Sequence, residues 1–114
     1  MFYKKSFGQL GENIALIYYQ NLGYKLISKN YHSRYGEIDL VFKKDNQITV
    51  VEVKTRSNKK FVWAEESIDN KKINNIYQTY QKLSLEKNLP EFFILEALII
   101  ELAGQRAKIY RYQL

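Results

Sequence analysis

The chain has 114 residues and a formal net charge of +6, with 46% hydrophobic and 26% charged residues, one proline and one histidine. This length fits a single domain over residues 1–114, and the composition excludes a disordered or low-complexity protein. The absence of cysteine excludes thiol catalysis, cysteine-ligated zinc, iron–sulfur clusters and a disulfide scaffold. Chemistry must therefore come from carboxylates, lysine, tyrosine or serine.

The chain begins with a pattern that predicts a helix and then a strand. Apolar residues at helical spacing predict a helix over 7–22, with Ser6 and Gln9 as a capping box at its start and Gly23 at its end. Loose alternation of apolar and polar residues predicts a strand over 24–31.

A β-hairpin is predicted next. Two β-rich runs, 37–43 and 47–56, lie on either side of Asp45-Asn46, which is typical of a tight turn. Residues 57–68 show no clear period and predict a loop.

The last part of the chain predicts one long helix and two more strands. Asp69 can cap a helix that runs to about Lys87, and strands are expected over 92–102 and 108–113 around a turn at Gly104. The predicted class is therefore α/β, with the element order α-β-β-β-α-β-β.

The apolar runs are too short to cross a bilayer. The longest cover residues 14–19 and 92–100, and the second contains Glu96. Residues 1–6 lead into glycine and glutamate rather than into the apolar segment of a signal peptide. These features predict a cytoplasmic protein with no membrane association.

All of the net charge lies in the first half of the chain. Residues 1–63 hold eleven basic and five acidic residues, whereas residues 64–114 hold seven of each. An anionic partner such as nucleic acid would explain this excess. The alternative is compositional, because the chain is rich in lysine, asparagine, isoleucine and tyrosine together, as A/T-rich codons would produce.

The predicted hairpin brings three acidic side chains and one lysine to one face. A two-residue turn places Asp39 opposite Glu52 and Glu37 opposite Lys54. Opposed Cβ atoms in a sheet lie about 5 Å apart, and at an effective dielectric near 20 two carboxylates at this distance repel by about 3 kcal/mol. The pattern therefore needs a compensating positive charge.

A divalent cation would supply that charge. Glu52 lies in the run 48–53, which is apolar on both faces and predicts a central strand, where an ionised carboxylate is disfavoured. Lys54 supplies one positive charge, but a cation bound between Asp39 and Glu52 would compensate both acids, and oxygen ligands select Mg²⁺ or Mn²⁺. The alternative is an ordinary surface pair of glutamate and lysine.

Three motifs occur together at a spacing that points to one family. They are Gly8-x-x-Gly11-Glu12-x-x-Ala15, Gly36-Glu37-Ile38-Asp39-Leu40 and Val51-Glu52-Val53-Lys54-Thr55-Arg56. Over nearly its whole length the chain resembles the YraN-like family of uncharacterised bacterial proteins. Through that family it resembles the PD-(D/E)XK nuclease superfamily, and archaeal Holliday junction resolvases are closest in pattern. The resemblance implies a restriction-endonuclease-like core, with a mixed central sheet of about five strands flanked by helices.

The resemblance also implies an activity and assigns residues to it. It implies a Mg²⁺- or Mn²⁺-dependent endonuclease that hydrolyses phosphodiester bonds of DNA, including branched or single-stranded DNA, and that forms a homodimer. Asp39 and Glu52 match the metal-binding acids, Lys54 matches the catalytic lysine, and Glu12 matches a further acid of the metal site. Glu96 stands where the family usually has an aspartate in a late strand, and we expect it to be a buried structural acid. The alternative function is a non-catalytic nucleic-acid-binding module with the same fold.

Basic residues close to these motifs are candidates for DNA contacts. Lys71 and Lys72 lie in the first turn of the second predicted helix, where positive charge opposes the helix dipole. A phosphate bound at the helix start would explain them, and solvated lysines are the alternative. Arg34 and Arg56 flank the acidic motifs and are expected to contact phosphate. Tyr35 could stack on an unpaired base, but packing on the sheet is the expected role.

Overall fold

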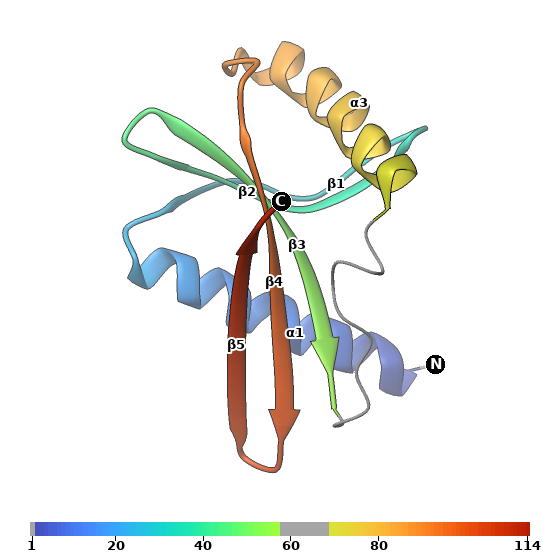
Figure 1. Ribbon diagram of the computed structural model, residues 1–114, viewed down its shortest axis with the longest axis vertical. Coiled ribbons are helices and arrows are strands. Elements are labelled where there is room, and N and C mark those ends of the chain that lie inside the picture. Colours follow the sequence, from blue (N-terminus) through green and yellow to red (C-terminus); the bar gives the residue numbers. More distant parts are fainter. Residues whose placement is uncertain (1, 58–68) are drawn as a thin grey trace.

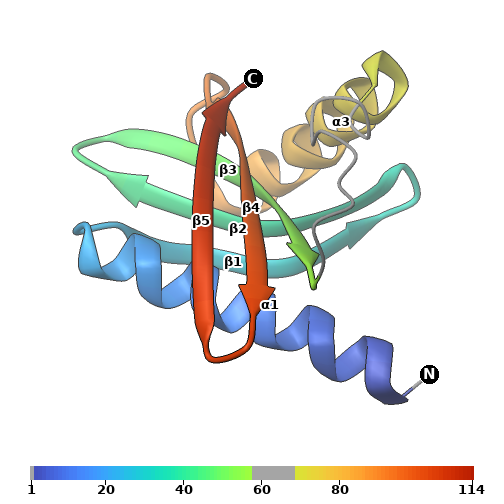
Figure 2. The same cartoon turned by 60° about the horizontal axis from the view of Figure 1, so that its bottom comes forward.

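Five strands form one mixed sheet with the spatial order β1-β2-β3-β4-β5, and a helix lies on each side of it (Figure 1, Figure 2). The structure is a computed structural model that describes residues 2–57 and 69–114. Strands β3 and β4 are parallel, and the other neighbouring pairs are antiparallel. The elements are α1 (Phe2–Asn21), β1 (Lys25–Ser33), β2 (Gly36–Lys44), β3 (Gln47–Arg56), α3 (Asn70–Lys87), β4 (Ile94–Ala103) and β5 (Arg106–Gln113). The predicted class, element order and five-stranded mixed sheet are confirmed.

The first helix is longer than the sequence pattern predicts. Helix α1 begins at Phe2, so Ser6 lies inside the helix and the predicted capping box with Gln9 is wrong. The end of the helix is predicted correctly, because α1 stops at Asn21 and Gly23 turns the chain with a φ of 93°, which glycine adopts at little cost. The loop predicted over 57–68 lies, apart from its first residue, outside the described residues.

The hairpin of β2 and β3 has the predicted turn and register. Asp45 and Asn46 have φ values of 51° and 65°, as a two-residue type I′ turn requires. The ladder runs from the pair of Lys44 and Gln47 to the pair of Leu40 and Val51. The turn therefore fixes which residues of the two strands meet.

Two apolar clusters cover the two faces of the sheet. The cluster under α3 contains Ile38, Val41, Ile48, Val50, Ile76, Tyr80, Leu83, Phe93 and Leu95. The cluster under α1 contains Ala15, Tyr19, Leu40, Phe42, Val51, Leu98 and Ile100. Because successive side chains on a strand point to opposite faces, Val50 and Val51 belong to different clusters and the two helices cover opposite faces.

The start of α3 is fixed beside the turn between β1 and β2. Asp69 caps the helix as predicted, because its Oδ1 accepts a hydrogen bond of 2.9 Å from the backbone N–H of Lys72. Further along the helix, the hydroxyl groups of Ser33 on β1 and Thr79 on α3 are 2.7 Å apart and connect the two elements. In the described part of the chain, no helix has the length and apolar character needed to span a membrane.

Candidate functional site

Asp39 lies where β2 and β3 separate. The ladder between these strands ends at the pair of Leu40 and Val51. Beyond that pair, the backbone N–H of Val53 donates a hydrogen bond of 2.8 Å to a side-chain oxygen, Asp39 Oδ2. This contact holds the Asp39 side chain against β3, next to Glu52.

Neither of the two predicted opposed pairs, Asp39 with Glu52 and Glu37 with Lys54, belongs to the ladder between β2 and β3. The ladder between β2 and β3 ends before these positions, and Glu37 pairs instead with His32 on β1, whose Nε2 is 3.9 Å from Glu37 Oε2. Lys54 follows Glu52 by two residues on β3, so strand alternation keeps both side chains on the same face.

Glu52 is a buried acid with incomplete partners. Its side chain is only 4% exposed, and Oε1 lies 3.4 Å from Lys72 Nζ. The other oxygen, Oε2, is buried and has no hydrogen-bond partner among residues 2–57 and 69–114. A buried carboxylate oxygen without a partner is costly, which makes this atom a candidate ligand for a cation.

The folded environment of Asp39 and Glu52 disfavours the ionisation of both side chains. Burial, together with the charge of Asp39, raises the pKa of Glu52 to about 7, and the charge of Lys72 opposes this increase. Burial also raises the pKa of Asp39 to about 6, against the effect of the Val53 N–H, and the charges of Glu12 and Glu37 add to the increase. One lysine therefore does not neutralise the pair.

Glycine at position 11 explains how Glu12 approaches this pair. A Cβ atom on Gly11 would collide with Oγ1 of Thr55 on β3, so only glycine allows α1 to lie this close to the strand. The next residue, Glu12, is then near enough for its charge to act on Asp39. The motif that contains Gly11 and Glu12 thus has a steric and an electrostatic role.

The acid pair has the donor chemistry that a hard divalent cation prefers. Asp39 and Glu52 supply oxygen atoms, one of them buried and unpartnered, in a place where positive charge is needed. No group of three or more acidic or histidine side chains is suitably placed for a metal ion within the described part of the chain. Beyond the side chains of Asp39 and Glu52, the backbone, water and a substrate are further sources of oxygen ligands for such an ion.

The predicted basic contacts fall in two places. Lys71 and Lys72 line a cleft between the start of α3 and the turn that follows β1. Arg34 lies in that turn, where its Nη2 donates to the Tyr35 hydroxyl over 2.7 Å and its guanidinium lies 4.9 Å from the centre of the Tyr35 ring. Tyr35 is 38% exposed and lines the cleft. Arg56 ends β3, beside Glu101 of β4.

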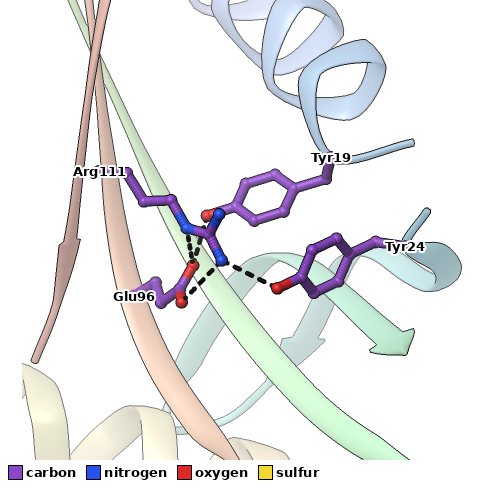
Figure 3. Close-up of polar contacts among 4 residues, drawn as sticks. All are labelled: Tyr19, Tyr24, Glu96 and Arg111. Carbon is purple, nitrogen blue, oxygen red and sulfur yellow. Dashed lines mark hydrogen bonds and ion pairs between the residues drawn. The ribbon is translucent and has the colours of Figure 1, made fainter. Parts of the chain in front are cut away.

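Glu96 is a structural acid, as the sequence led us to expect. It pairs in register with Val51 and therefore points to the α1 face, away from Glu52. Its Oε1 accepts hydrogen bonds from the Tyr19 hydroxyl over 2.7 Å and from Arg111 Nε over 2.9 Å, and Arg111 Nη2 also donates to Oε2 (Figure 3). Both oxygens of this buried acid have partners, in contrast to Glu52.

The cation that lies against Glu52 differs from the one that the sequence predicts. Lys54, two residues away on the strand, was the expected compensating charge, but the lysine that lies against Glu52 is Lys72 from α3. A signal was present, because a lysine in the first turn of a helix opposes the helix dipole and so needs another reason to be there.

Comparisons with known proteins identify one group of relatives. Residues 11–100 match the sequence profile described as "Uncharacterised protein family UPF0102". A UPF0102 protein of Syntrophomonas wolfei is 40% identical over 89 residues, which cover 78% of this chain and 76% of that protein. One from Sulfurihydrogenibium is 45% identical over 82 residues, covering 72% and 71%. One from Clostridium botulinum strain Kyoto is 37% identical over 97 residues, covering 85% and 79%.

Proposed function

Because the chain belongs to the uncharacterised protein family UPF0102, we propose a function from its own site: a Mg²⁺-dependent endonuclease that hydrolyses phosphodiester bonds of DNA. One observation carries the proposal. Asp39 and Glu52 form a buried acid pair with raised pKa values, and Glu52 Oε2 has no hydrogen-bond partner within the part of the chain that the structure describes. The resemblance of the surrounding motifs to the PD-(D/E)XK superfamily supports the same activity.

Asp39 and Glu52 would hold the metal ion, and Glu12 would add negative charge beside them. Mg²⁺ or Mn²⁺, when bound, polarises a phosphate oxygen and lowers the pKa of a water molecule. The Val53 N–H fixes the orientation of the Asp39 carboxylate through its 2.8 Å hydrogen bond. The burial of Glu52 keeps bulk water away from its carboxylate and so strengthens its interaction with any cation.

The lysines of the site neutralise the substrate. Lys54 lies on the same face of β3 as Glu52, where its ammonium group stabilises negative charge that develops on the phosphate during attack by water. Lys72 lies against Glu52 and adds a second positive charge at the same place. Arg34, Arg56 and Lys71 attract the DNA backbone more generally, because they carry positive charge near the acid pair or at the end of β3.

A second function is favoured by one contact. The ion pair with Lys72 already places a positive charge against the buried Glu52 carboxylate. With this charge in place, the fold does not need a metal ion, and a protein that binds nucleic acid without cutting it would keep the same ion pair. This second candidate is a non-catalytic nucleic-acid-binding module.

One experiment separates the two functions. The purified protein is incubated with linear duplex, single-stranded and four-way-junction DNA, with Mg²⁺, Mn²⁺ or a chelator, beside Glu52→Gln, Lys54→Ala and the exposed control Glu91→Gln. The proposal expects metal-dependent cleavage by the wild type and the control, and a loss of at least about a hundredfold in the two site variants. Equal cleavage by all four proteins would mean a contaminating nuclease. Binding without cleavage under every metal condition would favour the binding module.

Metal binding has its own readout. Mg²⁺ is expected to raise the melting temperature of the wild type and of Glu91→Gln, and to leave Glu52→Gln unchanged, because only the folded acid pair binds the ion. The resolvase resemblance also suggests a homodimer, which light scattering of the purified protein would test.

A further inference from the structure

A cleft of about 270 Å³ opens beside the acid pair. Residues of the turn between β1 and β2 and of the first turns of α3 line it. Figure 1 shows that this turn and the start of α3 lie near each other. Its volume is close to the lower limit of about 300 Å³ for pockets that hold small organic ligands, which fits one flat ring system better than a larger molecule.

The cleft combines a flat apolar surface with polar groups. Tyr35 and Ile76 line it with an aromatic ring and an aliphatic side chain, and Asn75 adds an amide that can both donate and accept hydrogen bonds. Lys71 and Lys72 add positive charge to the lining, and Glu37 and Asp69, which also line the cleft, add negative charge. A nucleobase has the matching features, because its faces stack on aromatic rings, its edge pairs with an amide and its backbone phosphate is attracted to lysine.

Lys72 connects this cleft to the acid pair. It lines the cleft, and its Nζ lies 3.4 Å from Glu52 Oε1, so a ligand in the cleft lies next to the buried acid. A base in duplex DNA is stacked and paired and cannot enter a cleft of this kind without leaving the helix. An unpaired nucleotide can enter without that cost.

We propose that the cleft holds one unpaired nucleobase of a DNA strand whose backbone lies at Asp39 and Glu52. This inference rests on the proposed function, and it names the substrate class: DNA with an unpaired nucleotide beside the bond that is cut. Tyr35 provides the stacking surface, Asn75 contacts the edge of the base, and Lys71 and Lys72 neutralise the adjoining phosphate.

Binding of labelled oligonucleotides tests the proposal without cleavage. Fluorescence anisotropy in chelator compares a single strand with a blunt duplex of the same sequence, for wild type, Tyr35→Leu, Asn75→Ala and the control Tyr110→Leu. Tyr110 is 40% exposed, close to the 38% of Tyr35, but it lies on β5 and does not line the cleft. Circular dichroism confirms that each variant is folded.

We expect the wild type to bind the single strand more tightly than the duplex. Loss of the stacking ring in Tyr35→Leu should weaken single-strand binding about tenfold and leave duplex binding unchanged. Asn75→Ala should also weaken only single-strand binding, and Tyr110→Leu should change neither. Equal affinity of the wild type for both DNAs, no DNA binding at all, or the same loss in Tyr110→Leu as in Tyr35→Leu would overturn the proposal.

Different results would refute the cleft assignment and the endonuclease function. Single strands that bind through Tyr35 but are never cut with Mg²⁺ would leave the cleft assignment intact and refute the nuclease. Duplex DNA that is cut with Mg²⁺, and bound as tightly as the single strand, would support the nuclease and refute the cleft assignment.

Discussion

Replacing Glu52 with glutamine is expected to stabilise the metal-free protein above neutral pH. Burial raises the pKa of this carboxyl from 4.5 to about 7, so the folded state resists its ionisation. One pKa unit corresponds to about 1.4 kcal/mol, and the increase therefore removes about 3 kcal/mol from the free energy of unfolding once Glu52 is fully ionised. Glutamine has nearly the same shape and carries no charge at any pH.

The sign of the pH dependence follows from proton binding. Between pH 4.5 and about 7 the folded protein keeps a proton on Glu52 that the unfolded chain has released, so the stability of the wild type falls as pH rises through this window. The free energy of unfolding of Glu52→Gln lacks this contribution. The difference between variant and wild type should therefore be close to zero at a pH of about 4.5 and reach about 3 kcal/mol in favour of the variant at a pH of about 8.

Urea unfolding followed by circular dichroism measures this difference. The two proteins are compared at several pH values in chelator. Other titrating groups contribute to both curves and largely cancel in the difference, except Asp39, whose pKa depends on the charge at position 52. Our reasoning about the buried carboxylate is refuted if the difference does not grow between a pH of about 4.5 and a pH of about 8, or if the variant is the less stable protein at the higher pH.

Three further substitutions test the packing around the site, all by urea unfolding. Gly11→Ala should destabilise the fold by about 1–3 kcal/mol because its methyl group meets Thr55, and Thr55→Ala in the same chain should restore most of that loss. Gly8→Ala is the matched control, since a Cβ there meets nothing within 4 Å; an equal loss in both glycine variants would contradict the steric explanation. Asp69→Ala should cost about 1 kcal/mol through loss of the helix cap, and an unchanged midpoint would show that the cap is dispensable. Glu96→Gln should cost about 2 kcal/mol because charge-assisted hydrogen bonds are lost, in contrast to the gain expected for glutamine at position 52, and a gain at both positions would refute the contrast.

Local sequence signals were reliable where a short segment decides the structure. The turn at Asp45-Asn46 needs only two residues with positive φ, and that geometry sets the register of β2 against β3 up to Leu40 and Val51. Asp69 marks the start of α3 because a single side chain satisfies a free backbone N–H.

Sequence signals failed at the start of α1 and at the end of the ladder between β2 and β3. Helix α1 continues to Phe2 in spite of a plausible capping box at Ser6. The strands separate beyond Leu40 and Val51, so the simple extension of the register to Glu37 and Lys54 does not hold. The turn residues Asp45 and Asn46 set the register of this ladder, but they do not determine the point at which it ends.

The sequence by itself determined the α/β class, the order of the elements and the identity of the two acids, because alternation, turn residues and caps act over a few residues. Only the tertiary structure decided which cation lies against Glu52. Lys72 reaches that acid because α3 packs on one face of the sheet, and Gly11 brings Glu12 near Asp39 because α1 packs closely on the other. Packing of the helices on the sheet thus decides which of the charges behind the +6 total lie beside the acid pair. Burial leaves two acids with raised pKa values at the point where the strands separate, and one lysine from a distant helix compensates them only in part.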